Sequence, residues 1–324
     1  MFKNLLKNKI AIVFPASDFL ATEIDNLDIF LANNQLEYCY CFDRSDALNG
    51  LSLADDFANR SPQKRFNELS SAINNDECSI IWVGRGGYGS AEILSMLYRM
   101  PRPKQQKIII GFSDITAINL FFIRQWNWQV ISAPMLLQLV NSTISNFATR
   151  QIVDLVNRNV ANLCYDISLV NANYCQEKQI NTTIKSTIIG GCLSVVASHF
   201  GTKNTINWQN QILFLEDEGE SGERLDRYFQ QILTIIIETG KFPVAILLGN
   251  FNQENQHGKI NRPNIAKAVD KFANKILANN LPIPLWQDSK GILGHSFEMM
   301  PLVLNFKANI VKKDEHWQIT QELI

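Results

Sequence analysis

Lys107-Ile-Ile-Ile-Gly-Phe-Ser-Asp-Ile-Thr116 is the stretch of sequence that decides the fold. Its apolar run, Ile108–Phe112, is typical of a buried strand, and a helical pattern follows over Ile115–Gln125. The glycine at position 111 interrupts the run and predicts a tight turn between the two elements. A strand that turns directly into a helix is the repeating unit of parallel sheets, so this stretch predicts an α/β fold.

The same alternation of strand and helix signals runs through the first half of the chain. Strand candidates are Ile10–Phe14, Glu37–Cys41, Ser79–Val83 and Gln129–Ile131, and helix candidates between them are Phe19–Asn33, Pro62–Ile73 and Ser90–Tyr98. We expect a parallel sheet with helices on both faces. Ligands bind such sheets at the carboxyl ends of the strands, where Pro15–Ser17, Gly84–Gly89 and Gly111–Asp114 would meet.

The second half predicts a separate domain. Residues 141–185 are richer in Asn and Thr and weaker in periodicity, apart from one helix near Phe147–Ala161. We therefore expect a nucleophile domain at 1–150, a linker at 151–185 and a C-terminal domain at 186–324. The C-terminal domain is expected to begin with the segment Ser186–Ala197. Its strand candidates are Gln211–Leu215, Val244–Leu248, Gly291–Gly294 and Leu302–Phe306, and its helix candidates are Arg224–Thr239 and Ile265–Leu277.

The composition is that of a globular protein with a sizeable core. Of the 324 residues, 46% are hydrophobic and 19% charged, and the formal net charge of -1 gives no reason to expect a nucleic-acid partner. No run of about 18 apolar residues predicts a membrane span. None of the six cysteines forms a C-x-x-C pair, so we expect free thiols and a cytoplasmic location. No histidine or cysteine spacing predicts a metal site, and no cofactor is expected.

Ser113 is the first candidate for chemistry. A tight strand-to-helix turn would expose its hydroxyl beside the free N–H groups of a helix N-terminus, which is what a serine nucleophile needs. The match to the G-x-S-x-G elbow is partial, because Ile115 stands where the second glycine would be. The alternative is that Ser113 or Asp114 simply caps the helix.

A serine nucleophile needs a base, and the chain has four histidines. His199 is expected to pack or cap a helix, while His257 and His316 lie among polar residues. His295 follows the strand candidate Gly291–Gly294, from which it could project into a cleft. Glu216 ends another strand candidate and could orient the imidazole, whereas the acids that follow it are expected to form a solvated turn.

The segment Gly84-Arg-Gly-Gly-Tyr-Gly89 is the other sharp pattern. It follows a strand and precedes a helix, which is the geometry of a phosphate cradle, but it lacks the Lys-Ser/Thr of a P-loop. Its glycines would equally let the backbone approach an oxyanion and donate an N–H group. A tight turn without a ligand is the third possibility.

Taken together, these motifs resemble the LD-carboxypeptidase family of serine peptidases, which includes the microcin C immunity hydrolases. The matching segments are Ile10–Ser17, Arg85–Gly89, Gly111–Thr116, Gly190–Ser194, Leu213–Asp217, Arg224–Arg227 and Gly294–His295. The chain departs from common family patterns at Ser132-Ala-Pro134 and at Cys192.

The resemblance implies both a fold and a site. The fold is an N-terminal parallel-sheet domain like that of class I glutamine amidotransferases, with a smaller C-terminal α/β domain of the swivelling type. The implied triad is Ser113 as nucleophile, Glu216 as orienting acid and His295 as base. The oxyanion and substrate-binding set that it implies comprises the backbone N–H groups of Asp114 and Gly87, with Gly86 and Arg85 in the same loop.

The resemblance also implies an activity. Family members remove the terminal D-alanine from murein tetrapeptide, commonly as homodimers, and in many this serves cytoplasmic recycling of peptidoglycan. One alternative is a related amidase acting on a peptidyl-nucleotide such as microcin C. An alternative of a different class is a non-catalytic protein that binds an anion at Gly84–Gly89.

Overall fold

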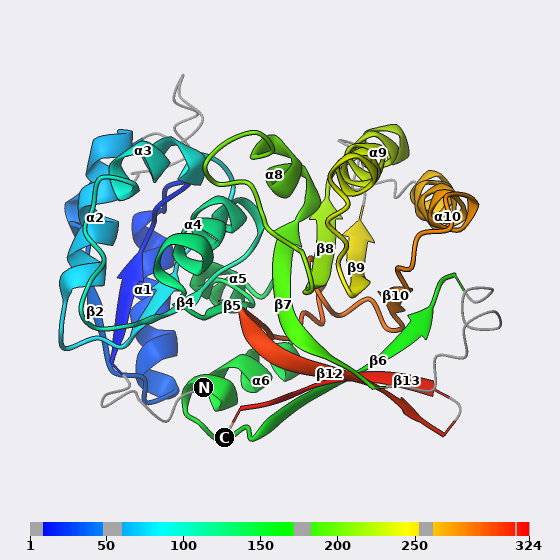
Figure 1. The fold of residues 1–324 in the computed structure, drawn as a ribbon. Coiled ribbons are helices and arrows are strands. Elements are labelled where there is room, and N and C mark those ends of the chain that lie inside the picture. The colour runs from blue at the N-terminus through cyan, green and yellow to red at the C-terminus, as the bar shows by residue number, and fades with distance from the viewer. Residues whose placement is uncertain (1–8, 48–59, 172–182, 253–261, 315, 324) are drawn as a thin grey trace. The chain divides into compact units, whose positions relative to one another are not determined.

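The fold is taken from a computed structural model that describes residues 9–47, 60–171, 183–252, 262–314 and 316–323. Contacts between α-carbons divide the chain into two compact units. The first comprises Met1–Ala161 and Phe297–Leu302, and the second comprises Asn162–Ser296 and Val303–Leu323. Each is an α/β structure built on its own sheet, as Figure 1 shows.

The six-stranded sheet has the strand order β11-β5-β4-β3-β1-β2, and all of its strands except part of β11 belong to the first unit. The pairings of β2 with β1, β1 with β3, β3 with β4 and β4 with β5 are all parallel. Every residue of β1, β3 and β4 is buried, which is the mark of a sheet covered on both faces. The strands are β1 (Ile10–Val13), β2 (Tyr38–Tyr40), β3 (Ile80–Val83), β4 (Ile108–Ile110), β5 (Val130–Ser132) and β11 (Leu302–Leu304).

Helices connect these strands, as the alternating sequence pattern predicted. The apolar face of α2 packs on β1, and α4, buried at most of its positions, packs on β5. Short 3₁₀ turns at Arg44–Asp46, Ser90–Ile93 and Ser113–Ile115 supplement the helices. The helices are α1 (Ala21–Asn33), α2 (Pro62–Asn74), α3 (Leu94–Leu97), α4 (Thr116–Trp126), α5 (Leu136–Val140) and α6 (Asn146–Val156).

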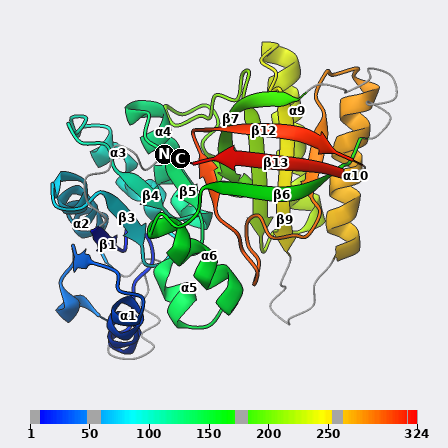
Figure 2. The same cartoon turned by 90° about the horizontal axis from the view of Figure 1, so that it is seen from below.

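The sheet of the second unit closes into a barrel with the strand order β10-β6-β13-β12-β7-β8-β9. The pairings from β7 through β8 and β9 to β10 are parallel, and the remaining ones are antiparallel. Figure 2 shows β12, β13 and β6 side by side. The strands are β6 (Asn162–Leu169), β7 (Ile184–Cys192), β8 (Ile212–Glu218), β9 (Ala245–Asn252), β10 (Leu285–Asp288), β12 (Phe306–Lys313) and β13 (His316–Glu322).

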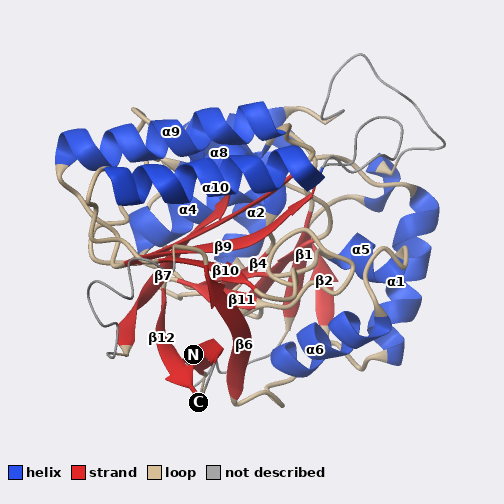
Figure 3. Ribbon diagram, turned by 90° about the vertical axis from the view of Figure 1, so that its right-hand side faces the viewer, coloured by secondary structure: helices blue, strands red, loops and turns tan. Residues whose placement is uncertain are grey.

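Three helices make the crossovers between the parallel strands of this barrel: α8 (Leu193–Ser198), α9 (Gly222–Thr239) and α10 (Arg262–Ala278). Figure 3 shows α9 and α10 side by side. Their contact includes Phe229 stacked on Phe272 with ring centroids 4.6 Å apart. Among the described residues, no helix is both long and apolar enough to cross a membrane.

Two expectations for this half differ from the structure. The range expected to be a linker, 151–185, contains β6, whose alternate residues are buried in the barrel. The strand expected at Gly291–Gly294 is absent, because these described residues form bends. The carboxylate of Asp288 accepts hydrogen bonds from the backbone N–H groups of Lys290, Ile292 and Leu293, which competes with strand pairing.

The ladder between β7 and β8 depends on a glycine. Gly190 has a φ of +144°, and a Cβ placed on it would lie 1.8 Å from the carbonyl oxygen of Phe214. Because backbone atoms cannot move aside cheaply, Gly190→Ala should lower the free energy of unfolding by about 3 kcal/mol or more. Gly201→Ala is the matched control, since Gly201 also has positive φ (+78°) but no atom near its Cβ position. Equal urea-unfolding midpoints for the two variants would contradict this explanation.

Candidate active site

Ser113 lies on a strained turn at the carboxyl end of β4. The strand ends at Ile110, and a 3₁₀ turn over Ser113–Ile115 leads directly into α4. Ser113 has a φ of +62°, in the left-handed region that residues other than glycine rarely adopt. A serine held in this conformation between a strand and a helix has the geometry of a nucleophile elbow. The turn inferred from Gly111 is therefore present, with the strain on Ser113 itself.

The glycine loop after β3 lies beside Ser113. A Cβ placed on Gly86 would lie 3.6 Å from the Cβ of Ser113. The carbonyl of Gly86 accepts a hydrogen bond from the N–H of Ser17, at 3.1 Å. Because the two groups of a trans peptide point in opposite directions, the N–H of Gly87 points away from Ser17. Gly87 has a φ of +93°, and a Cβ on it would lie 2.3 Å from the hydroxyl of Ser17.

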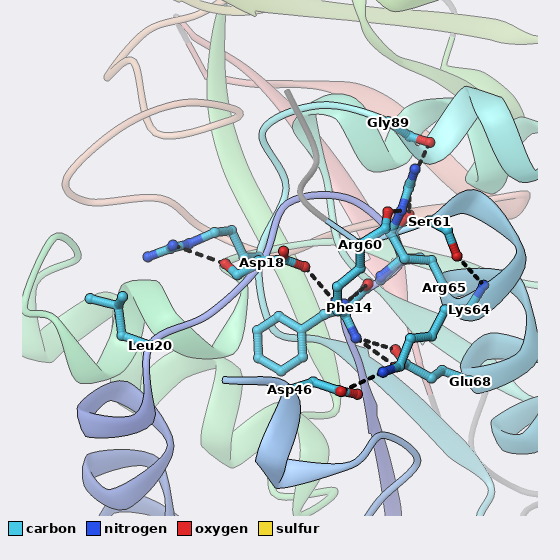
Figure 4. A network of polar contacts seen from close by, with 12 residues as sticks. Phe14, Asp18, Leu20, Asp46, Arg60, Ser61, Lys64, Arg65, Glu68 and Gly89 are labelled. Carbon is cyan, nitrogen blue, oxygen red and sulfur yellow. Dashed lines mark hydrogen bonds and ion pairs between the residues drawn. The ribbon is translucent and has the colours of Figure 1, made fainter. Parts of the chain in front are cut away.

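Two buried arginines brace the carboxyl end of β1, and one of them, Arg65, also holds the glycine loop (Figure 4). The guanidinium of Arg65 donates to the carbonyls of Pro15 and Gly89, at 2.9 and 2.7 Å. That of Arg60 donates to the carbonyl of Phe14 at 2.7 Å and to the carboxylate of Glu68 at 2.6 and 2.7 Å. Planar guanidinium groups with several fixed donors are suited to bracing backbone carbonyls in this way.

Neither arginine was identified from the sequence. Arg65 lies on the buried face of α2 with Leu69 and Ala72, so a cation at an apolar position of a helix was the available signal. Burial raises the pKa of Glu68 and that of Asp18, against the lowering effect of Arg60.

The other two residues predicted for this part of the site are engaged in structural contacts. The guanidinium of Arg85 donates to the carbonyl of Asp18 and pairs with Glu23 in the first turn of α1. The carboxylate of Asp114 accepts a hydrogen bond from the N–H of Ser90 at 2.9 Å, and burial raises its pKa. Both side chains therefore fix the loops around Ser113, and the role predicted for Asp114 concerns only its backbone N–H.

Glu216 and His295 form a buried pair in the second unit. Glu216, on β8, is fully buried, and its Oε2 atom lies 2.6 Å from Nδ1 of His295. The same oxygen accepts the backbone N–H of His295 at 3.1 Å. Gly294 permits this approach, because a Cβ there would lie 2.6 Å from Oε2 of Glu216. A carboxylate on Nδ1 fixes the tautomer and the orientation of an imidazole, and proton transfer then takes place through Nε2.

The position of His295 corrects one expectation. It lies on the loop of bends after β10, not at the end of a strand. The side-chain amide of Asn250, on β9, donates to its carbonyl and fixes the loop from the other side. His199, expected to pack or cap, is buried at the C-terminal end of α8, and burial lowers its pKa.

The charge on His295 is set by its acidic neighbours. Burial alone lowers the pKa of His295, but the charge and hydrogen bond of Glu216 and the charges of Glu218 and Asp217 outweigh it and raise the pKa to about 9. Glu218, expected in a solvated turn, lies with Oε2 3.6 Å from Nε2 of His295. Burial and the charge of Glu216 raise the pKa of Asp217 to about 7. This end of β8 therefore favours an imidazolium beside Glu216.

Comparison with known proteins identifies the class. Residues 10–133 match the LD-carboxypeptidase N-terminal domain, and residues 185–310 match the LD-carboxypeptidase C-terminal domain. The chain belongs to the LD-carboxypeptidase family and is a serine-type peptidase, a hydrolase. The family resemblance inferred from the motifs is confirmed.

Among curated proteins, it is 28% identical over 260 residues to a Rickettsia conorii protein named "Putative carboxypeptidase", covering 80% of this chain and 76% of that one. It is 28% identical over 200 residues to the murein tetrapeptide carboxypeptidase of Pseudomonas aeruginosa, covering 58% and 61%.

Solved structures share the fold. A muramoyltetrapeptide carboxypeptidase from Oxalobacter formigenes superposes with a TM-score of 0.72 at 20% identity, covering 97% of this chain and 98% of that one. An MccF-like protein from Bacillus anthracis gives a TM-score of 0.72 at 19% identity, covering 97% and 96%. Two sheets in two α/β units are thus an arrangement shared with this family.

The pair makes a prediction about protonation. Glu218→Gln removes a negative charge 3.6 Å from Nε2, so the pKa of His295 should fall from about 9 by roughly half a unit. The imidazolium should then be lost at lower pH. With only four histidines in the chain, NMR titration of the ring nitrogens can follow His295 directly. Glu220→Gln, two residues further along the chain and paired with Arg224, is the control and should leave the midpoint unchanged. If the titration midpoint of His295 does not shift in Glu218→Gln, the charge of Glu218 does not raise the pKa of His295 as described.

Proposed function

We propose that the protein is an LD-carboxypeptidase that releases the terminal D-alanine of murein tetrapeptide through an acyl-enzyme on Ser113. The observation that carries the proposal is the buried Glu216–His295 pair, in which the carboxylate on Nδ1 orients the imidazole for proton transfer through Nε2. The conformation of Ser113, in the first unit, also supports the proposal. A φ of +62° is strained for a serine, and such strained residues cluster at active sites.

The reaction would proceed in two stages. Neutral His295 takes the proton of Ser113 as its oxygen attacks the peptide carbonyl, and Glu216 stabilises the imidazolium that forms. The N–H groups of Asp114 and Gly87 would hold the oxyanion; in support, the Gly86 carbonyl accepts from Ser17, so the N–H of Gly87 is directed away from Ser17. His295 then protonates the leaving D-alanine, and water, deprotonated by His295, releases the acyl group.

The raised pKa of His295 has a place in this scheme. In the resting state the imidazolium lies between Glu216 and Glu218, so it must lose a proton before it can act as a base. Removal of that proton becomes easier as pH rises toward 9, which favours activity at mildly alkaline pH. Glu216 keeps the ring in place in both states.

The name of the Pseudomonas aeruginosa relative supports murein tetrapeptide as the substrate. A microcin C-type amidase is the alternative function, and it is consistent with the fold shared with an MccF-like protein. The fold does not favour it over the carboxypeptidase, because a muramoyltetrapeptide carboxypeptidase shares that fold equally well. The non-catalytic alternative is set aside, since the chain belongs to a peptidase family. A homodimer, a cytoplasmic location and a role in peptidoglycan recycling stay predictions.

Substitution of Ser113 tests the proposal. Ser113→Ala should lower kcat for D-alanine release from purified murein tetrapeptide by about 10⁴-fold, because the three side chains act as a unit. Ser198→Ala makes the same chemical change on an exposed serine of α8 and should retain full activity. An assay that offers a peptidyl-nucleotide conjugate beside the tetrapeptide distinguishes the LD-carboxypeptidase from the microcin C-type amidase, because each should prefer its own substrate. Near-normal D-alanine release by Ser113→Ala would overturn the mechanism.

A further inference from the structure

Three cysteines lie on or beside β2 and β3 of the first sheet, separate from Ser113. Cys39 lies on β2, Cys41 follows that strand, and Cys78 lies two residues before β3. The sulfur atoms of Cys39 and Cys78 are 3.3 Å apart. These two residues are 39 positions apart in the chain, so the fold creates this contact. Neither takes part in the proposed hydrolysis.

The surroundings of Cys39 favour its thiolate. The side-chain amide of Asn75 approaches its sulfur at 3.5 Å, and Cys78 can donate its S–H from the other side. The ammonium of Lys9 adds a positive charge, although Glu77, paired with Lys9 at 2.6 Å, partly offsets it. A hydrogen bond from Cys41 and then one from Cys78, together with the Lys9 charge, outweigh burial and lower the pKa of Cys39 to about 6.

Cys78 is held at Cys39 by a buried cation. The ammonium of Lys107, on a fully buried side chain, donates to the carbonyls of Asn75 and Cys78. It therefore fixes both the amide donor of Cys39 and the partner sulfur. Burial raises the pKa of Cys78 to about 12, with the hydrogen bond to Cys39 as the second cause. Cys78 is thus the thiol and Cys39 the thiolate of the pair.

Cys164 provides an internal comparison. It is the exposed cysteine of those described, whereas Cys39 is half-buried and Cys78 buried. Burial and the charge of Asp166 raise the pKa of Cys164. If accessibility alone decided reactivity, Cys164 would react first. If the fraction of thiolate decides it, Cys39 reacts first.

We propose that Cys39 and Cys78 form a peroxide-reactive thiol pair, a modification site separate from the peptidase site. The Cys39 thiolate attacks one oxygen of hydrogen peroxide, the O–O bond breaks, and the leaving hydroxide takes up a proton as water. The Cys78 sulfur then attacks the resulting sulfenic acid and loses its proton as the S–O bond breaks. A second water leaves, and a disulfide links Cys39 to Cys78. The two thiols are oxidised by two electrons and the peroxide is reduced.

Peptide mapping tests the linkage. The full chain is treated with hydrogen peroxide at pH 7, its remaining thiols are alkylated under denaturing conditions, and the digest is analysed by mass spectrometry. We expect a peptide pair joined through Cys39 and Cys78 that dithiothreitol separates again. In Cys78→Ser, Cys39 should instead be trapped as sulfenic acid by dimedone. A digest in which Cys39 and Cys78 stay alkylatable, or in which Cys39 pairs elsewhere, would overturn the proposal.

Alkylation rates test the thiolate without any oxidant. With iodoacetamide at pH 7 and no denaturant, Cys39 should react at least tenfold faster than Cys164, because rate follows the fraction of thiolate. Cys41→Ala should slow Cys39, since it removes a thiol donor to the Cys39 sulfur, and Cys192→Ala, at a buried cysteine in the other unit, should not. Faster alkylation of Cys164 than of Cys39 would refute the proposal. Neither test measures hydrolytic activity, so their outcome does not depend on the function proposed for Ser113.

Discussion

The burial of the Glu216 carboxylate is the constraint on which the second unit depends. An ionised carboxylate in a protein interior is costly unless a cation or hydrogen-bond donors accompany it. His295 supplies both through its ring and its backbone N–H, and the two contacts require that its loop approach β8 closely. Gly294 and Gly249 permit that approach, since a Cβ on either would collide with its neighbours. The barrel thus provides rigid strand ends, and the glycines let a loop deliver the base to them.

A second constraint shapes the first unit. A positive φ at Ser113 is stable only if the structure around it is firmly held, and the loops at the carboxyl ends of β1 and β3 provide this. Arg65 ties the two loops together through buried hydrogen bonds to the carbonyls of Pro15 and Gly89, and Arg60 holds the carbonyl of Phe14 at the end of β1 (Figure 4). Their charges are balanced by buried carboxylates such as Glu68. Because removing one partner would leave the others buried and unpaired, such a network resists local rearrangement.

Much of the first unit could be predicted from the sequence, since β1, β3 and β4 are apolar at every position and stand out as runs. The barrel could not. In β6 only alternate residues face the interior, and β13 is largely polar, so neither forms an apolar run. The bends around His295 depend on Asp288, which reaches N–H groups further along the chain. The Ser113 turn could be identified because a strand, a glycine and a helix are adjacent in sequence. The roles of Arg65 and Glu218 depend on distant contacts, to which no local pattern points.

The parallel sheet keeps two kinds of chemistry apart. Its carboxyl ends carry Ser113 and the glycine loop, where free backbone N–H groups favour an oxyanion. Lys9 and Cys78 precede β1 and β3, and Lys107 precedes β4, so they lie at the opposite edge. Strands of three or four residues separate the two edges by about 10 Å, at roughly 3.3 Å per residue. The Cys39 thiolate, which contacts Cys78 at that opposite edge, therefore has its own cations and donors, separate from the groups that position the serine.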